Sequence, residues 1–190
     1  MVIIFQLMGE IMNTQKTTSE KQIAKAKEEI IKEAKRIEES ALYTSKGHFA
    51  AAYFWSNFHL WIGIPIVVLA SISGASIIAK IDSYGLVVGV LSIFIAALSS
   101  VMTFLNPNQK SSAHLNAGNN YDSLQNNVRI FWSIDCWREE SDSLLTERLK
   151  YYSEQKDKLN QSNPQVPGWA YKKGKAGIKS GEADYEIDKK

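Results

Sequence analysis

The chain has 190 residues, of which 22 are lysine or arginine and 20 are aspartate or glutamate, so its formal net charge is only +2. Because both signs are mixed along the charged segments, the composition gives no indication of nucleic-acid binding. A single cysteine, Cys136, excludes an intramolecular disulfide and a CxxC metal pair.

Residues 1–18 are predicted to be a disordered or non-native extension. The first 12 residues are apolar, but no basic segment precedes them and no small-residue cleavage site follows, so they are not typical of a signal peptide. Gly9-Glu10 can be encoded as GGAGAA, a ribosome-binding sequence for a start at Met12. Mass spectrometry of natively expressed protein tests this hypothesis, and a mature chain that begins at Met1 would contradict it.

Residues 19–57 are predicted to form an N-terminal amphipathic helix. Small and aliphatic residues recur at spacings of three and four, which places them on one face: Ile23, Ala26, Ile30, Ala34, Ile37 and Ala41. The other faces are densely charged. An apolar face this narrow, which we call the seam, needs a partner helix to cover it.

Aromatic residues gather where this helix meets the next segment. Rings of this kind collect at the headgroup depth of a membrane, so Tyr53, Trp55, Phe58 and Trp61 are predicted to form an interfacial aromatic belt. His48 and His59 flank the belt. They either pack at the interface or act as a pH sensor or a metal ligand.

Residues 58–105 are predicted to form a transmembrane hairpin. Its two limbs, Phe58–Ala79 and Tyr84–Leu105, have 22 residues each and no Asp, Glu, Lys or Arg. As helices they would be about 33 Å long, enough to cross a hydrocarbon layer roughly 30 Å thick. Two buried helices of a soluble domain are the alternative, but such helices usually keep one polar face. A turn of four residues makes the limbs antiparallel and leaves both chain ends on one side.

Small or hydroxylated residues recur along the second limb at spacings of four and three, and we call this set the stripe: Gly85, Gly89, Ser92, Ala96, Ser99 and Thr103. Gly63, Ala70 and Gly74 are a weaker counterpart in the first limb. Small residues let membrane helices approach closely. The stripe either packs the two limbs of one chain, packs hairpins of different subunits, or lines a water-filled pore.

A proline after the hairpin, Pro107, lacks the amide hydrogen that a continuing helix needs. Residues 111–162 are predicted to form a C-terminal amphipathic helix, with a bend because an unbroken helix would be about 70 Å long. Its apolar face is large and aromatic: Leu115, Tyr121, Leu124, Val128, Phe131, Trp132, Trp137, Leu144, Leu145, Leu149 and Tyr152. Packing the two amphipathic helices together, or against other subunits, would bury both faces.

Residues 163–190 are predicted to be a tail. It is either flexible or docks on the amphipathic helices or the membrane surface through Trp169, Tyr171 and nearby lysines. Basic residues are slightly more frequent outside the hairpin, at Lys46 and Lys110, than in its turn, at Lys80. Together with the missing export signal, this predicts that both termini are cytoplasmic.

No catalytic motif is present, such as HExxH, GxSxG or a glycine-rich phosphate loop. We therefore expect no enzymatic activity, no cofactor and no bound metal. An enzyme with a site built across the two amphipathic helices is the weakest alternative.

The chain resembles the SLATT group over roughly residues 41–160, through His48-Phe49, Gly63-Ile64-Pro65, Ser73-Gly74, Ala117-Gly118 and Tyr121. SLATT proteins are small two-span proteins of bacterial conflict systems, associated with SMODS nucleotidyltransferases and SLOG domains. The resemblance implies that residues 19–162 form one SLATT-like domain of an all-α membrane protein, a two-helix transmembrane hairpin flanked by long cytoplasmic amphipathic helices.

The resemblance also implies a function in bacterial antiviral defence by abortive infection. Such an effector would oligomerise in the inner membrane and open a pore, or otherwise disrupt the membrane, when a separate sensor such as a nucleotidyltransferase is triggered. No catalytic residue is carried over from the family. The alternative function is a non-conducting membrane anchor or scaffold that recruits a partner protein to the lipid bilayer.

Overall fold

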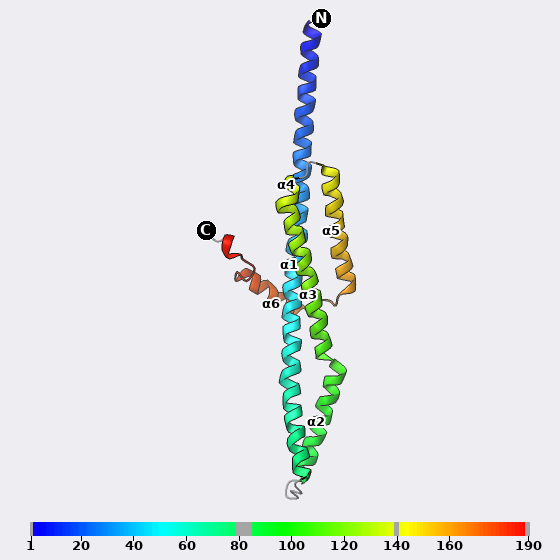
Figure 1. Cartoon of the computed structure of the whole chain (residues 1–190), viewed down its shortest axis with the longest axis vertical. Helices are drawn as coiled ribbons and strands as arrows, with labels where there is room; N and C mark the ends of the chain where they lie inside the picture. Colours follow the sequence, from blue (N-terminus) through cyan, green and yellow to red (C-terminus); the bar gives the residue numbers. More distant parts are fainter. Residues whose placement is uncertain (1, 79–84, 139–140, 189–190) are drawn as a thin grey trace. The chain divides into compact units, whose positions relative to one another are not determined.

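The computed structural model describes residues 2–78, 85–138 and 141–188, with side chains described for 24–76, 85–138 and 141–187. All regular elements in these ranges are helical (Figure 1). In chain order they are α1 (Val2–Ile78), α2 (Gly85–Leu105), α3 (Pro107–Ile130), a π-helical turn η2 (Phe131–Asp135), α4 (Cys136–Arg138), α5 (Asp142–Ser162), α6 (Gly168–Lys179) and a 3-10 turn η3 (Glu186–Asp188). The prediction of an all-helical protein is confirmed.

Two helical stretches are long and apolar enough to cross a membrane, one within Ala24–Ser76 and one within Gly85–Arg138. Only 6% of the first apolar window and none of the second is buried inside the protein. A core helix of a soluble domain would be covered by its neighbours. The structure therefore contains the two apolar helices that the sequence predicts.

α1 is one continuous helix from Val2 to Ile78, so it begins well before the predicted start near residue 19. The segment 2–18, expected to be disordered or non-native, contains a single glycine and no proline to interrupt a helix. Pro65 lies inside the helix. A proline there is tolerated in a membrane helix because neighbouring groups can satisfy the freed carbonyl.

The chain divides into two compact units, and α1 contributes to both. Unit 1 comprises Met1–Ser45 and Asn119–Ser162, and unit 2 comprises Lys46–Gly118 and Asn163–Lys190. Each unit is described separately below.

The hydrophobic core of unit 1 lies between α1 and the elements α3, η2, α4 and α5. From α1 it receives the last four residues of the predicted apolar face, Ile30, Ala34, Ile37 and Ala41, whereas Ala26 is exposed and the side chain of Ile23 lies outside the described residues. The opposite side is built from α3, η2, α4 and α5: Tyr121, Leu124, Val128, Phe131, Cys136 and Leu145. Small residues on α1 therefore face larger ones, which lets the helices pack closely.

Polar contacts fix the register of α1 in unit 1. The carboxylate of Glu38 accepts hydrogen bonds from Gln125 Nε2 at 3.2 Å and Trp132 Nε1 at 2.5 Å. The ammonium group of Lys35 lies 4.4 Å from the centre of the Trp132 ring. A cation over an indole face is attracted by the ring quadrupole.

The single helix predicted over residues 111–162 is divided in the structure, and α5 runs back antiparallel to the preceding segment. Tyr121 donates a hydrogen bond to Asn160 at 2.7 Å, the rings of Phe131 and Tyr152 are 5.4 Å apart, and Arg148 pairs with Asp135 at 3.0 Å. Folding back covers apolar surface that one straight helix would leave in water.

The start of α5 carries a local signal that the hydrophobic pattern hides. Ser141 Oγ accepts a hydrogen bond from the backbone amide of Leu144 at 3.4 Å, as an N-cap residue does. Asp142 places a carboxylate in the first turn, where the helix dipole favours negative charge. Because apolar residues recur at helical spacing on both sides of Ser141, the sequence had predicted one continuous helix over residues 111–162.

In unit 2, α1 and α3 lie antiparallel next to the hairpin. Ser111 Oγ donates a hydrogen bond to the carbonyl of Ala52 at 2.9 Å. A Cβ on Gly118 would lie 2.7 Å from the ring of Phe49, so only glycine allows this approach. α2 ends at Leu105 and α3 begins at Pro107, with Asn106 between them in a left-handed conformation (φ 42°).

Candidate functional site

The candidate site consists of the two uncharged limbs of the hairpin, together with the aromatic belt at the start of the first limb. Its outer surface consists of large apolar side chains that are exposed in the single chain: Leu86, for example, is 84% exposed, Phe104 89% and Trp61 79%. In water such a surface would be costly at about 25 cal/mol for each Å². This exposure fits the two helices that are long and apolar enough to cross a membrane.

The exposure pattern shows which face of each limb is shielded. Along α2 the partly buried positions recur at helical spacing: Val88, Leu91, Ile95, Ser99, Met102 and Leu105. On α1 the shielded positions are Ile62, Gly63, Ile66, Leu69, Ser73, Gly74 and Ser76, and Ser73 is only 7% exposed. Large aliphatic residues therefore occupy most of the shielded face of α2, whereas the shielded face of α1 combines large and small residues.

The stripe lies mainly outside these shielded faces. Gly85, Gly89, Ser92, Ala96 and Thr103 are exposed, and only Ser99 is partly buried. On the first limb, Ala70 is exposed while Gly63 and Gly74 are partly buried. A Cβ built on Gly63, Gly74, Gly85 or Gly89 would meet no atom within 4 Å. Within one chain, therefore, none of these glycines makes the close contact that small residues permit.

Hydroxyl groups on the limbs are already satisfied as donors by their own helix. Ser92 donates to the carbonyl of Val88 at 2.8 Å, and Thr103 donates to that of Ser99 at 2.9 Å. Ser71, Ser76 and Ser100 make the same bond to the residue four positions earlier. This bond lowers the cost of placing a hydroxyl in an apolar medium and leaves its oxygen able to accept a hydrogen bond.

Two residues of the aromatic belt, Trp55 and Phe58, are in ring contact with each other. Trp55 and Phe58 are edge to face at 5.9 Å, and the Lys110 ammonium lies 4.4 Å from the Trp55 ring centre. Tyr53 and Trp61 are largely exposed. Phe54, which was not assigned to the belt, contacts Trp55, Phe58 and Trp169.

A buried histidine pair lies beside the belt, and only one member was singled out from the sequence. His48 Nδ1 and His114 Nδ1 are 2.9 Å apart, and His48 is 1% exposed. Burial, with a contribution from His114, lowers the pKa of His48 to about 4, and burial also lowers the pKa of His114. Both rings are neutral near pH 7, so one Nδ1 carries a hydrogen and the other accepts it. His59 lies elsewhere, on the exposed surface of α1.

The sequence contained a signal for His114. The two histidines are at nearly equal distances from the hairpin turn, so antiparallel pairing brings them together. The contacts of Lys110 with Trp55 and of Trp169 with Phe54 could not be predicted in this way, because they depend on side-chain direction and on α6.

Among the residues whose side chains are described, no three His, Cys, Asp or Glu are grouped so that they could hold a metal ion. Cys136 is buried in unit 1, and burial raises the pKa of its thiol, which disfavours the reactive thiolate. Comparison with protein-family models, curated proteins and solved structures returned no match.

Proposed function

We propose that this protein is a membrane effector whose hairpin inserts in the bacterial inner membrane, self-associates through the stripe and disrupts the bilayer. The observation that carries the proposal is the stripe itself, a row of small residues left open on a charge-free hairpin. An open row of small residues allows a second hairpin to approach closely, and packing of this kind drives association in lipid.

Further support comes from the entrance of the hairpin. The aromatic belt and Lys110 provide the amphipathic groups that anchor a helix at headgroup depth. Both charged segments outside the hairpin would then remain in the cytoplasm. The resemblance to SLATT proteins adds the biological setting, abortive infection triggered by a separate sensor such as a nucleotidyltransferase.

Membrane potential and dye entry in induced cells test the proposal. Expression should collapse the potential before growth stops. Gly89→Leu with Ser92→Leu should abolish the collapse because two large side chains would block close approach. Val87→Leu with Val90→Leu is the matched control, since it adds bulk to the exposed aliphatic face of the same helix. Growth arrest with an intact potential would overturn the proposal.

A non-conducting scaffold is the second candidate, and one observation in unit 1 favours it. Ile130, Ile134 and Trp137 recur at helical spacing and are 47%, 48% and 71% exposed. An exposed apolar row on a charged unit is typical of a surface that binds another protein. Growth arrest that survives the two leucine substitutions in α2 but is lost in Ile134→Ser with Trp137→Ser would favour the scaffold.

A further inference from the structure

We infer that α6 is an interfacial helix that binds the headgroups of anionic phospholipids. The inference rests on the membrane insertion of the proposed function, but it does not require a pore. Three observations support it: the packing of α6 against α1, the side chains next to this contact, and the positive charge on the outer surface of α6.

α6 is seated on α1 by backbone contact. Its buried residues are Ala170, Gly174 and Gly177, which recur at helical spacing on one face. A Cβ on Gly174 would lie 2.8 Å from the backbone nitrogen of Gly47, and a Cβ on Gly47 would lie 3.5 Å from the Cα of Tyr171. Figure 1 shows α6 leading away from α1 rather than along it. A helix held in this way crosses the axis of the hairpin and projects sideways.

The face beside this contact is directed toward the aromatic belt. The rings of Trp169 and Phe54 are edge to face at 4.9 Å, and the Lys173 ammonium lies 5.4 Å from the ring centre of Tyr53. Tyr53 and Phe54 follow Gly47 on α1 in the direction of the first apolar limb. Trp169 and Lys173, which share a face because they are four residues apart, therefore lie on the side of α6 nearer the membrane.

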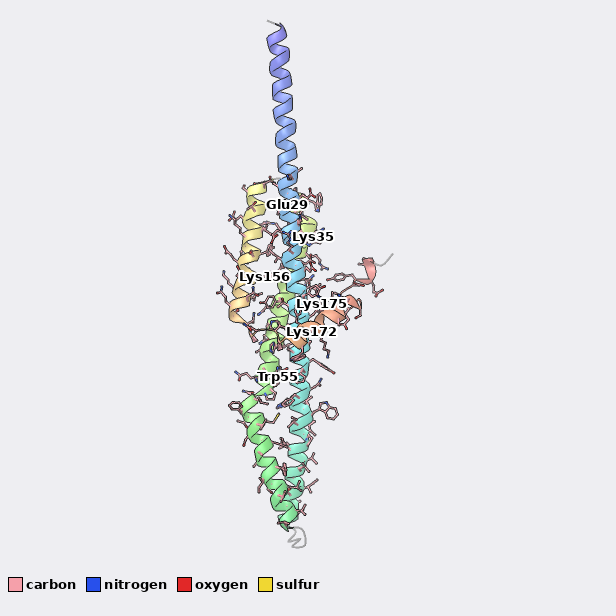
Figure 2. All side chains as sticks on the ribbon, turned by 180° about the vertical axis from the view of Figure 1, so that it is seen from behind. Glu29, Lys35, Trp55, Lys156, Lys172 and Lys175 are labelled. Carbon is pink, nitrogen blue, oxygen red and sulfur yellow. The ribbon has the colours of Figure 1, made fainter. Side chains whose placement is uncertain are left out.

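The remaining surface of α6 is basic. Lys172, Lys175 and Lys179 are exposed, as is Lys173, and the segment Gly168–Lys179 contains no acidic residue. None of these four lysines belongs to an ion pair among the described side chains. Figure 2 shows Lys172 and Lys175 on α6 and Trp55 of the belt on α1.

Four unpaired ammonium groups beside a belt at headgroup depth match a surface of lipid phosphates. Each lysine near an anionic membrane surface strengthens attachment about fivefold, and the effect decays within about 10 Å at moderate salt. Tryptophan at the same level adds an apolar body with a polar edge. An acidic protein would satisfy the charge but would not explain why Trp169 packs against Phe54, next to the belt.

Hydrogen exchange of the full chain in lipid nanodiscs tests the inference. Exchange of amides 168–179 should be about tenfold slower or more in discs that contain phosphatidylglycerol than in discs of phosphatidylcholine alone. The difference should vanish in about 1 M salt, where charges are screened within about 3 Å. Phosphatidylcholine discs with added inorganic phosphate should not reproduce it; protection by phosphate alone would overturn the lipid assignment.

Two sets of variants test whether the protection by anionic lipid depends on the positive charge of α6 or only on its folding. Lys172→Gln, Lys173→Gln and Lys179→Gln together should remove the lipid dependence, and the same three positions changed to Arg should keep it. Lys150→Gln, Lys156→Gln and Lys158→Gln on α5 form the matched control and should leave it unchanged. Equal exchange in both lipids, or a lipid dependence that survives loss of the α6 charges, would refute the inference. Because exchange does not measure conduction, a protein that fails the membrane-potential test can still pass this one.

Discussion

Replacing Gly174 by alanine should release α6 from α1. The added Cβ would lie 2.8 Å from two backbone atoms, Gly47 N and Lys46 C, and backbone cannot move aside as a side-chain end can. Overpacking of this kind costs about 1–3 kcal/mol. Alanine also favours an isolated helix by about 1 kcal/mol over glycine, but this gain is the same whether α6 is packed against α1 or released from it. Docking should therefore weaken by about 1–3 kcal/mol.

Hydrogen exchange in detergent micelles measures this loss without a contribution from anionic lipid. A cost of about 1–3 kcal/mol corresponds to exchange of the α6 amides roughly 5 to 150 times faster. Gly168→Ala is the control, because a Cβ on Gly168 would meet no atom within 4 Å. The reasoning fails if the two variants exchange alike, or if only amides outside α6 respond to Gly174→Ala.

The remaining predictions concern acid sensitivity and the core of unit 1. The pKa of His48 is lowered from about 6.5 to about 4 by folding, so its contribution to the free energy of unfolding is complete above pH 6.5 and is lost as the pH falls toward 4. Thermal unfolding should show a loss of about 2 kcal/mol of stability between pH 7 and 5, and His48→Gln should reduce this pH dependence. Leu145→Ala should destabilise unit 1 by about 2–5 kcal/mol because Leu145 is fully buried, whereas Leu144→Ala, at a 37% exposed position, should have a much smaller effect on the unfolding midpoint. Glu38→Ala should lower the stability of unit 1 by about 1–3 kcal/mol in the same measurement, because Gln125 and Trp132 would lose their acceptor. Glu39→Ala, on the exposed face, is the control and should change the unfolding midpoint little. Equal effects of the two substitutions would contradict the assigned hydrogen bonds.

The parts of the fold that follow from local pattern were predictable. The absence of charge in two stretches of hairpin length predicted the apolar helices, and the spacing of Ile30, Ala34, Ile37 and Ala41 predicted the face of α1 that enters the core. Both are properties of a single helix. Neither depends on what the helix packs against.

The parts that depend on a partner were not predictable in the same way. α5 folds back although apolar residues continue at helical spacing through the break, and only the cap at Ser141 marks the new start. α6 contains three glycines although glycine is a poor helix former: Gly174 meets the backbone of α1, whereas Gly177 meets the carboxylate of Glu182. The stripe was predicted from spacing alone, and spacing does not say which neighbour a face will meet.

The joint at Asn106 gives the two limbs unequal freedom. The first limb is continuous with the helix that carries the belt, the histidine pair and the seat of α6. The second is attached through one left-handed residue followed by a proline, which has no amide hydrogen to donate to a carbonyl of α2. Rotation about this residue would swing α2, with its glycines and hydroxyls, while the anchored limb stays in place. Distances between spin labels on α1 and α2 would record such a swing. Such a rotation would move the stripe, which lies on α2, and leave the first limb in place.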